Sequence, residues 1–562
     1  MSESNRPTAL SGAREGRLGL ALSGGGFRAA LFHIGVLASL AEQDLLRHVA
    51  VISTVSGGGI IGAFYYLKVR QLLEGSRGDG LQSSAEAFRK IVSEIEQEFL
   101  PPLQLNLRLL TFADRHQNAR ILANEYSSSQ RLADLFDQHF FQPLSGTERT
   151  LLRDLPIQNQ VSGSAVAPAL IINATSLNTG HLFQLTGTHI GEVNVASVSG
   201  GNPDIPHLPR LDIGDTRLSP IQQHYLNRIT LGQAVAASCC VPGLFEPLCL
   251  NGLYRDSKGE PVELRLVDGG VFDNQAVVSL LEERCSHVIS SDASDRLPWQ
   301  SHPAEVVHQV ALRTNDIMMD RIRSEVLHEL KQKNPGEYAI LSLGENDNNP
   351  IFAEHNPRFF NALRNIRTDL DAFTDLEACS LMYHGFRLCE HQLSAADSEP
   401  SPAPGDGRNS PHPWQFLQLE KIAADQVGRD RLLHQLDIGA RQFFKVFYLG
   451  EPLPWIIMLL PSVIPVGSSA LLIYLLPPIP NSAWILLGLA LVTIVALVQN
   501  ARIVQWLDQV AWIRRNRSRL VTALKPIGIT MLLGAVGALT SWVNLRIFNR
   551  LFLRYGRLRQ QD

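Results

Sequence analysis

In the stretch VISTVSGGGIIGAF, Ser56 lies between two apolar runs, and three glycines follow it. One interpretation is a tight connection from strand to helix, in which glycine supplies backbone angles that other residues avoid. The other is a nucleophile elbow, a strained turn that holds a serine hydroxyl above a sheet for attack. The stretch alone leaves both interpretations open, and Ser56 becomes a candidate nucleophile.

An earlier glycine cluster, in ALSGGGFRAALFHIGVL, could bind an anion. Gly24, Gly25 and Gly26 lie between an apolar run and an amphipathic pattern, so their N–H groups can converge beside the positive end of a helix. The same glycines fit a dinucleotide fingerprint, which needs an acidic residue at the end of the next strand. That strand ends at Ser56 without a carboxylate, which argues against a nucleotide site.

A serine nucleophile needs a base, and a carboxylate is the best candidate for it. Asp268, in LRLVDGGVFDNQ, ends an apolar run, and the two glycines after it allow another backbone to approach closely. Taken alone, such an aspartate also suits a turn or a helix cap. None of the 17 histidines lies in a catalytic motif, and His33, on the helix after the glycine loop, fits a packing role better.

Together these motifs resemble the patatin-like phospholipase family. The family pattern is a glycine-rich loop with a following arginine, a G-x-S-x-G serine and a later D-G-[GA] aspartate, which here read SGGGFRA, TVSGG and DGG. NATSLNTG and AASCCVPGLFEP also look like family sequence, and the first two motifs are similar to those of cytosolic phospholipases A2. The resemblance covers about residues 16 to 300. Thr54 departs from it, because glycine is expected there, and implies a different local packing.

The resemblance implies a role for each matching residue. Ser56 would form an acyl-enzyme, and Asp268 would take its proton directly, without a histidine. The backbone amides of Gly24, Gly25 and Gly26 would form the oxyanion hole. Arg28 would steady that loop or contact a lipid phosphate, with a structural ion pair as the alternative. This chemistry implies no metal and no organic cofactor.

The elements that must position these residues have an α/β pattern. Short apolar runs alternate with helical periodicity over residues 16–390, which predicts a patatin-like sandwich with a mostly parallel central sheet flanked by helices. The leucine-rich segment Glu98 to Phe112 is expected to be a core helix or loop rather than a lipid-facing lid. The predicted strands are residues 18–22, 49–53, 169–173, 264–267 and 287–291.

Composition divides the rest of the chain. The N-terminus lacks the apolar core of a signal peptide, and the stretch near residue 400 is rich in Pro, Ser and Gly and has little to bury. The expected segments besides the hydrolase domain are a polar tail (1–15), a flexible linker (391–413), a juxtamembrane helical segment (414–450), an α-helical transmembrane region (451–548) and a basic tail (549–562).

The membrane prediction rests on charge-free stretches. No Asp, Glu, Lys or Arg occurs between Glu451 and Arg502, and residues 455–476 and 483–498 each approach the roughly 17–25 residues that a spanning helix needs. A buried core hairpin is the alternative, and residues 526–543 are a third candidate span. Basic residues after the second stretch place the N-terminal domain on the cytoplasmic side. The basic tail after the third stretch favours an even number of crossings.

Overall charge narrows the function further. With 50 basic and 54 acidic residues the net charge is -4, which argues against a nucleic-acid binder. Six cysteines without paired spacing indicate a reducing compartment. The expected protein is a membrane-anchored acyl hydrolase that acts on phospholipid or another acyl lipid in the bilayer. A transacylase or neutral-lipid lipase, and a non-catalytic lipid-binding scaffold, stay open as alternatives. The sequence names no protein partner.

Overall fold

The chain forms two compact units. The first comprises residues 1–445 and 552–562, and the second comprises Val446–Leu551. The site described below lies entirely in the first unit. The computed structural model describes residues 12–77, 83–113, 126–146, 149–158, 165–193, 207–294, 297, 299–303, 305–334, 337–344, 357–394, 413–441, 445–448, 541–542 and 544–558.

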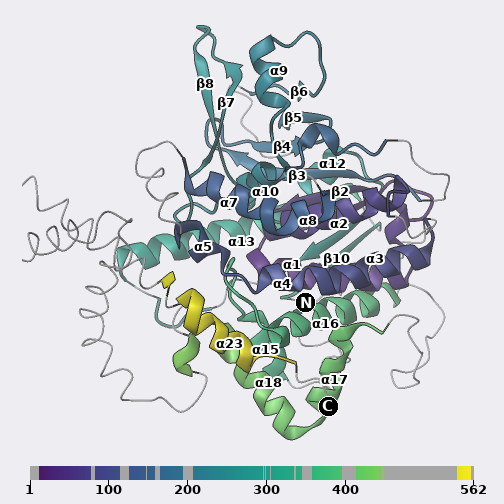
Figure 1. Cartoon of the computed structure of the whole chain (residues 1–562), viewed down its shortest axis with the longest axis vertical. Coiled ribbons are helices and arrows are strands. Elements are labelled where there is room, and N and C mark those ends of the chain that lie inside the picture. Colours follow the sequence, from purple (N-terminus) through teal and green to yellow (C-terminus); the bar gives the residue numbers. More distant parts are fainter. Residues whose placement is uncertain are drawn as a thin grey trace, which may run out of the picture. The chain divides into compact units, whose positions relative to one another are not determined.

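Ten strands of the described part form one sheet (Figure 1). Its order is β10-β9-β1-β2-β3-β4-β5-β6, with β8 paired to both β3 and β7. The five strands from β10 to β3 run parallel, while β4 to β8 pair antiparallel. The bounds are β1 (Leu18–Leu22), β2 (Val49–Val55), β3 (Ala169–Ser176), β4 (Leu182–Thr186), β5 (His189–Glu192), β6 (Leu211–Asp212), β7 (Leu248–Arg255), β8 (Pro261–Asp268), β9 (His287–Asp292) and β10 (Tyr338–Ser342). The predicted parallel core and all five predicted strands are therefore confirmed.

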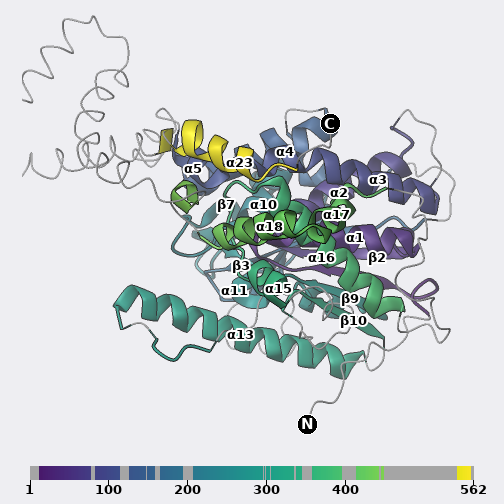
Figure 2. The same ribbon diagram turned by 90° about the horizontal axis from the view of Figure 1, so that it is seen from below.

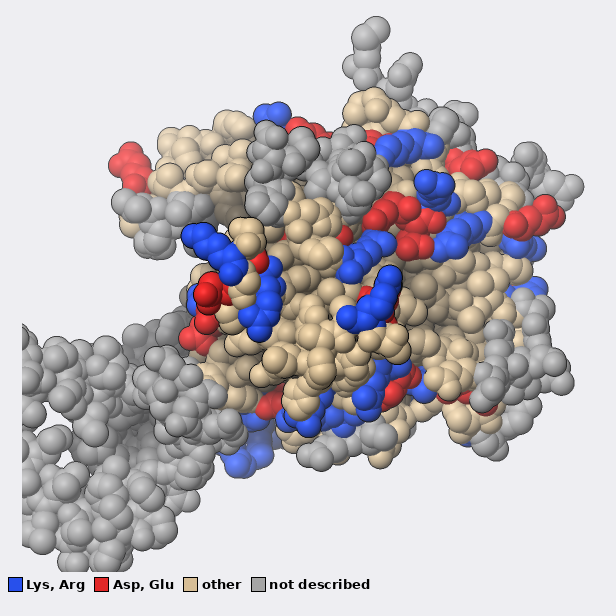
Figure 3. Space-filling model, turned by 90° about the horizontal axis from the view of Figure 1, so that it is seen from above, with Lys and Arg blue, Asp and Glu red and all other residues tan. Residues whose placement is uncertain are grey.

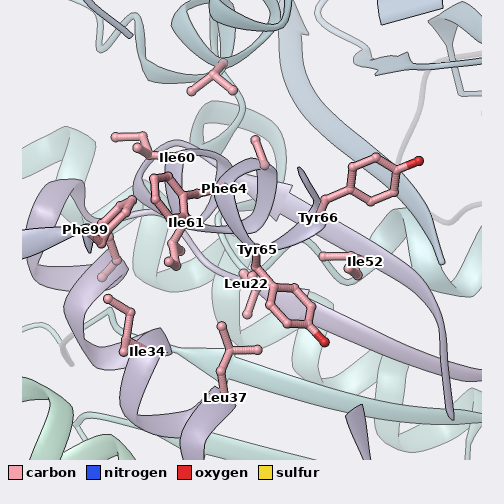
Figure 4. Packing of buried hydrophobic residues seen from close by; sticks show 14 of the residues in the cluster. Leu22, Ile34, Leu37, Ile52, Ile60, Ile61, Phe64, Tyr65, Tyr66 and Phe99 are labelled. Carbon is pink, nitrogen blue, oxygen red and sulfur yellow. The ribbon is translucent and has the colours of Figure 1, made fainter. Parts of the chain in front are cut away.

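Alternating side chains of the central strands supply two separate cores. In β1, Leu22 lies in the larger core with α1 and α2, whereas Ala21 points into a smaller core shared with α12 and α13. Figure 4 shows side chains from β1, β2, α1 and α2 gathered in the larger core, where the rings of Phe64 and Phe99 lie 5.1 Å apart. Because both faces are buried, the parallel strands read as continuous apolar runs in the sequence.

Helices cover both faces of the sheet. In Figure 2, α13 lies on the opposite side of the sheet from α1, α2 and α16. The principal helices are α1 (Gly26–Glu42), α2 (Gly57–Leu73), α3 (Ala85–Glu98), α10 (Leu231–Cys239), α12 (Val278–Glu282), α13 (Val307–Lys333), α16 (Asp375–Ser394) and α18 (Gln426–Gly439). The shorter helices are η1 (Leu46–His48), α4 (Leu100–Leu103), α5 (Leu107–Ala113), α7 (Ser128–Phe136), η2 (Asp137–Phe141), α8 (Gln142–Ser145), η3 (Leu152–Asp154), α9 (Pro220–Leu226), α11 (Gly270–Asp273), α15 (Pro357–Arg364), η5 (Gln415–Leu417), α17 (Gln418–Ala424), η6 (Lys445–Tyr448), η7 (Asn544–Phe548) and α23 (Asn549–Tyr555).

Helix α16 belongs to the core of the first unit. It crosses α1 at two glycines: a Cβ on Gly35 would lie 1.9 Å from the Met382 carbonyl oxygen, and one on Gly385 would lie 2.3 Å from that of Phe32. The helix continues past residue 390, where the sequence placed the end of the hydrolase domain, and the first unit extends to residue 445.

The leucine-rich segment after α3 forms the short helices α4 and α5. Leu103 and Leu107 in this segment are fully buried, as expected for a core segment. Phe99 before them is also fully buried. The prediction of a core helix or loop is therefore confirmed for this part of the segment.

The predicted membrane stretches lie outside the described residues, apart from Ser541 and Trp542 at the end of the third. Among the helices that the structure does describe, none combines the length and the apolar character needed to cross a bilayer.

Basic and acidic side chains lie next to one another on the face shown in Figure 3. Ion pairs of this kind recur in the first unit, for example between Arg210 and Glu282 at 2.6 Å. A nucleic-acid site needs a field of one sign over a broad surface. The described residues of this face show no such basic field.

Candidate active site

Ser56 occupies a strained turn between β2 and α2. Its backbone angles, φ 49° and ψ −118°, lie outside the regions that residues with a side chain favour, which costs about 1–3 kcal/mol. The turn is closed by the Gly59 amide, which donates to the Ser56 carbonyl oxygen at 2.8 Å. The side chain thus stands at the positive N-terminal end of α2. This is the geometry of the nucleophile elbow that the sequence left as one of two interpretations.

The glycines after Ser56 allow two backbones to touch. A Cβ on Gly57 would lie 2.0 Å from the Gly26 carbonyl oxygen, and one on Gly58 would lie 2.2 Å from that of Leu22. Any side chain at either position would push the elbow away from the first glycine loop. The backbone of the second glycine cluster therefore packs directly against the backbone of the segment that contains the first.

Thr54, the departure from the family pattern, is accommodated by a glycine on the facing helix. Its hydroxyl donates to the Ile171 carbonyl oxygen on β3 at 3.0 Å. A Cβ on Gly62 of α2 would lie 2.5 Å from the Thr54 methyl group. The extra side chain on the strand is thus offset by a missing one on the helix, and the elbow keeps its shape.

Asp268 ends β8 and contacts the nucleophile. Its backbone N–H donates to the Cys240 carbonyl oxygen at 3.0 Å, and the Gly270 amide donates to its Oδ1 at 2.7 Å. Burial raises the pKa of Asp268 to about 6, although the hydrogen bonds from Gly270 and from the Ser56 side chain act to lower it. The structure therefore joins the two residues that the sequence predicted as nucleophile and base.

The Ser56 hydroxyl has a second neighbour in the Cys239 thiol. Burial raises the pKa of the thiol well above its usual value, while the nearby Ser56 side chain acts to lower it. The thiol is therefore neutral at physiological pH. It does not compete with Asp268 for the serine proton, because only the carboxylate is a charged acceptor.

The glycine loop lies beside Ser56, but its three amides differ. The Gly24 N–H donates to the Asn274 carbonyl oxygen at 2.9 Å, so this amide is occupied and cannot serve the oxyanion as predicted. In the part of the chain that the structure describes, the amides of Gly25 and Gly26 have no such partner. Their φ angles of 135° and 57° are open to glycine at low cost. Of the three predicted oxyanion donors, Gly24 is bound elsewhere, and Gly25 and Gly26 stay candidates.

Arg28 holds backbone carbonyl groups. Its Nη1 donates to the carbonyl oxygens of Arg364 at 3.1 Å and Ile366 at 3.0 Å, and its Nη2 donates to that of Ala293 at 2.9 Å. The Arg28 side chain is buried. The three carbonyl oxygens lie outside the glycine loop, so the role of Arg28 in steadying that loop or contacting a phosphate stays a prediction.

His33 is a neutral link between the loop and β9. Burial lowers its pKa to about 4, so the ring is uncharged at physiological pH. Nε2 lies 3.0 Å from the Ser23 carbonyl oxygen and therefore carries the proton, which leaves Nδ1 to accept from the Ser291 hydroxyl at 2.6 Å. The expected packing role of His33 agrees with these contacts.

Two polar residues that sequence reasoning gave no role brace the elbow. The Ser238 hydroxyl accepts the Ser56 N–H at 2.8 Å and donates to the Asn173 carbonyl oxygen at 2.5 Å. The Asn173 side chain donates to the Thr54 carbonyl oxygen at 3.0 Å. Both lie in the stretches NATSLNTG and AASCCVPGLFEP, whose likeness to family sequence was the only signal for them.

The chain is similar in sequence to one known family. The sequence of residues 20–281 matches the family model of patatin-like phospholipases. No curated protein matches the chain.

Among solved structures, human GIVD cytosolic phospholipase A2, in complex with a fluorophosphonate inhibitor and terbium chloride, is 15% identical over 69% of this chain, with a TM-score of 0.37. The aligned part spans 61% of that protein's length. VipD from Legionella pneumophila is 13% identical over 98% of this chain and 93% of its own, with a TM-score of 0.27. The type III effector ExoU is 14% identical over 95% of this chain and 82% of its own, with a TM-score of 0.24. On the sequence match, residues 20–281 form a patatin-like phospholipase domain with an α/β fold.

Proposed function

We propose that this protein is a serine acyl hydrolase that cleaves fatty-acyl esters of phospholipids. The observation that carries the proposal is the proximity of the Ser56 side chain to the buried carboxylate of Asp268, whose pKa it acts to lower. The two meet at a strained elbow, beside the Gly25 and Gly26 amides, which have no hydrogen-bond partner among the described residues. Membership of residues 20–281 in a family described as phospholipases supports the lipid substrate.

The reaction follows from the positions of these groups. The Ser56 Oγ attacks the ester carbonyl carbon while Asp268 takes the hydroxyl proton, and the carbonyl oxygen becomes an oxyanion. The amides of Gly25 and Gly26, with that of Gly57 at the start of α2, stabilise this charge by roughly 3–4 kcal/mol per donor. The tetrahedral intermediate collapses, and the departing alcohol takes the proton from Asp268. A water molecule then attacks the acyl-enzyme with Asp268 again as base, which releases the fatty acid and restores Ser56.

The contacts of Thr54 weaken the non-catalytic alternative. A scaffold that had lost its activity would carry the threonine as an uncompensated defect of the elbow. Here Gly62 leaves room for the threonine methyl group, and the strained turn of Ser56 is kept. A strained turn of this kind persists only where the surrounding structure holds it, and such turns cluster at functional sites.

The proposal includes attachment to a membrane through residues 451–548, with the catalytic unit facing the cytoplasm. Its support is the charge-free sequence between Glu451 and Arg502 and the basic residues that follow. An anchored enzyme meets a bilayer substrate at high effective concentration, because the tether replaces diffusion in three dimensions.

Fatty-acid release from mixed phospholipid vesicles tests the proposal. We expect Ser56→Ala and Asp268→Asn each to reduce the rate about a thousandfold or more, since removal of either half of a nucleophile–base pair disables the unit. Asp137→Asn is the matched control: this carboxylate is also buried, its pKa is also raised to about 6 by burial, and it binds the Gly232 amide instead of a nucleophile. Release that persists in both site variants would refute the assignment of Ser56 and Asp268.

A further inference from the structure

The glycine loop rests on a segment that lies outside the matched domain. We call residues 365–374, between α15 and α16, the strap. The Phe27 N–H, in the first turn of α1, donates to the Asp369 carbonyl oxygen at 3.0 Å. A Cβ on Gly26 would lie 2.6 Å from the same oxygen and 2.8 Å from the Asp369 nitrogen. The strap backbone is therefore in direct contact with one of the two unoccupied amide positions.

A buried arginine holds the strap in place. The Arg367 guanidinium is completely buried and donates to Glu377 Oε1 at 2.6 Å, to Asp371 Oδ2 at 3.2 Å and to the Gly439 carbonyl oxygen at the end of α18 at 2.8 Å. It also donates to the Ala372 carbonyl oxygen within the strap. One planar group thus ties the strap to α16 and α18 at once, which a point charge could not do.

Residues from the far C-terminal part close this cluster. Lys445 forms an ion pair with Asp371. The Phe552 ring lies 4.5 Å from the Lys445 Nζ and 5.8 Å from the Arg367 guanidinium carbon. Lys445 precedes and Phe552 follows the predicted membrane region, so the two flanks of that region meet at the strap.

The strap is clamped from its other side by the segment after α4. The Leu107 N–H donates to the Leu370 carbonyl oxygen at 3.0 Å, and Asn106 donates to the Asp371 Oδ1 at 2.6 Å. Arg108 forms an ion pair with the Asp369 side chain. The strap is therefore held from both sides. Because close-packed interiors deform little, a shift of the residues on one side of the strap also moves the residues on the other side.

We propose that Arg367 is a positioning residue for the oxyanion loop: by fixing the strap to α16, α18 and the C-terminal residues, it holds the amides of Gly25 and Gly26 where the oxyanion forms. The catalytic consequence rests on the proposed function. Oxyanion donors must be placed within about 0.5 Å, and two glycines with positive φ do not define their own conformation. The strap supplies the missing constraint.

The test compares two buried lysines in the purified full-length protein. Lys445→Met removes one ion of the cluster and leaves Arg367 to pair with Asp371. Lys68→Met is the matched control, because Lys68 is also buried and paired, with Glu94 at 3.1 Å and Glu98 at 2.7 Å, and does not touch the strap. Arg367→Met and Arg367→Lys complete the series.

Two measurements are made on each variant. The first is amide hydrogen exchange of the peptide that covers residues 24–30, which reports on the loop whether or not the protein is an enzyme. The second is kcat and KM with a soluble ester, p-nitrophenyl butyrate. For Lys445→Met and Arg367→Met we expect exchange in the loop to accelerate about tenfold or more and kcat to fall about 10- to 100-fold, with KM within about twofold. Arg367→Lys should recover part of the loss, and Lys68→Met should change neither quantity.

The outcomes separate the inference from the proposed function. If the parent hydrolyses no ester, the proposed function fails, and hydrogen exchange still decides whether the cluster orders the loop. If Arg367→Met does not fold, Lys445→Met carries the test. Loop exchange in Arg367→Lys and Lys445→Met equal to that in Lys68→Met, or a rise in KM with kcat unchanged, would overturn the proposal and leave Arg367 a purely structural residue.

Discussion

The strained backbone of Ser56 is braced by a neighbouring hydroxyl that takes no part in the proposed chemistry. Ser238 accepts the Ser56 N–H and passes the bond on to the Asn173 carbonyl oxygen. Without that acceptor, the buried N–H of the strained turn would be left unpaired, at a cost of about 1–3 kcal/mol. A single serine thus offsets strain of about the same size at the nucleophile.

The pH dependence of activity follows from the environment of Asp268. Burial raises its pKa to about 6, and the carboxylate must be ionised to take the serine proton. We therefore expect kcat/KM for a neutral ester to rise with pH and to reach half its maximum near pH 6. Asp137→Asn should keep this profile, although Asp137 titrates in the same range. A flat profile between pH 5 and 8 would exclude Asp268 as the base.

The same raised pKa predicts a stability effect with a defined sign. The folded pKa of Asp268 lies above the unfolded value of 3.8, so its contribution to stability is full below pH 3.8 and is lost as the pH rises through about 6. Above pH 6 the folded protein holds a buried charge. Asp268→Asn should then be more stable than the parent by up to about 3 kcal/mol, measured as the free energy of unfolding at pH 8. The difference should shrink towards pH 4, and a difference independent of pH would count against the assignment.

The sequence could single out Ser56 and Asp268 only through the order of several motifs, because each motif alone leaves a second interpretation open. It could not tell which amides of the glycine loop face outward, since Gly24, Gly25 and Gly26 are identical as letters. The Gly24 amide is bound by the Asn274 carbonyl oxygen, a contact that only the fold creates.

At the scale of elements, the elbow depends on how β2 faces α2. The Thr54 side chain occupies the space that a side chain at Gly62 would need. A Cβ on Gly62 would lie only 2.5 Å from the Thr54 methyl group. Position 54 therefore tolerates a large residue only because position 62 carries none. The pair explains how the fold departs from the family pattern without a change of geometry at Ser56.

This fit predicts coupled effects on stability. Thr54→Gly restores the family pattern, but removes the bond to the Ile171 carbonyl oxygen and leaves a gap, so we expect a loss of about 1–3 kcal/mol. Gly62→Ala alone should destabilise by a similar amount through the clash. The double variant should recover about 1 kcal/mol or more relative to the sum of the two losses, measured by urea unfolding. Additive losses would show that the two positions do not interact.

Strands were easier to predict than the limits of the unit. Parallel strands buried on both faces leave short apolar runs between turn residues, and all five predicted runs are strands. The contact of α1 with α16 leaves no such local signal, because Gly35 and Gly385 are far apart in sequence and meet only in the fold. The domain boundary predicted from composition was therefore placed at residue 390, before the predicted linker, whereas the first unit extends to residue 445.

At the scale of the whole molecule, the first compact unit is assembled from distant parts of the chain. The family match ends at residue 281, yet the strap, α16, α18 and the residues from Phe552 onward belong to the same compact unit. The Leu376 N–H donates to the Gly556 carbonyl oxygen at 3.0 Å, and a Cβ on Gly556 would lie 2.4 Å from that of Thr374. Local sequence patterns do not show that the C-terminal residues pack back onto this unit. A long intervening segment is no obstacle to such packing, because the entropic cost of closing a loop grows only slowly with its length.

The contribution of the C-terminal residues to the stability of the first unit can be measured by substituting Phe552. Its ring is 2% exposed and covers both cations of the buried cluster, so Phe552→Ala should lower the free energy of unfolding by about 3–5 kcal/mol. The neighbouring Leu551→Ala is the control, because Leu551 is 47% exposed and its loss should cost no more than about 0.5 kcal/mol. Urea unfolding followed by hydrogen exchange of the strap measures both. Equal effects of the two variants, with no change in the strap, would mean that the C-terminal residues attach to the catalytic unit without supporting it.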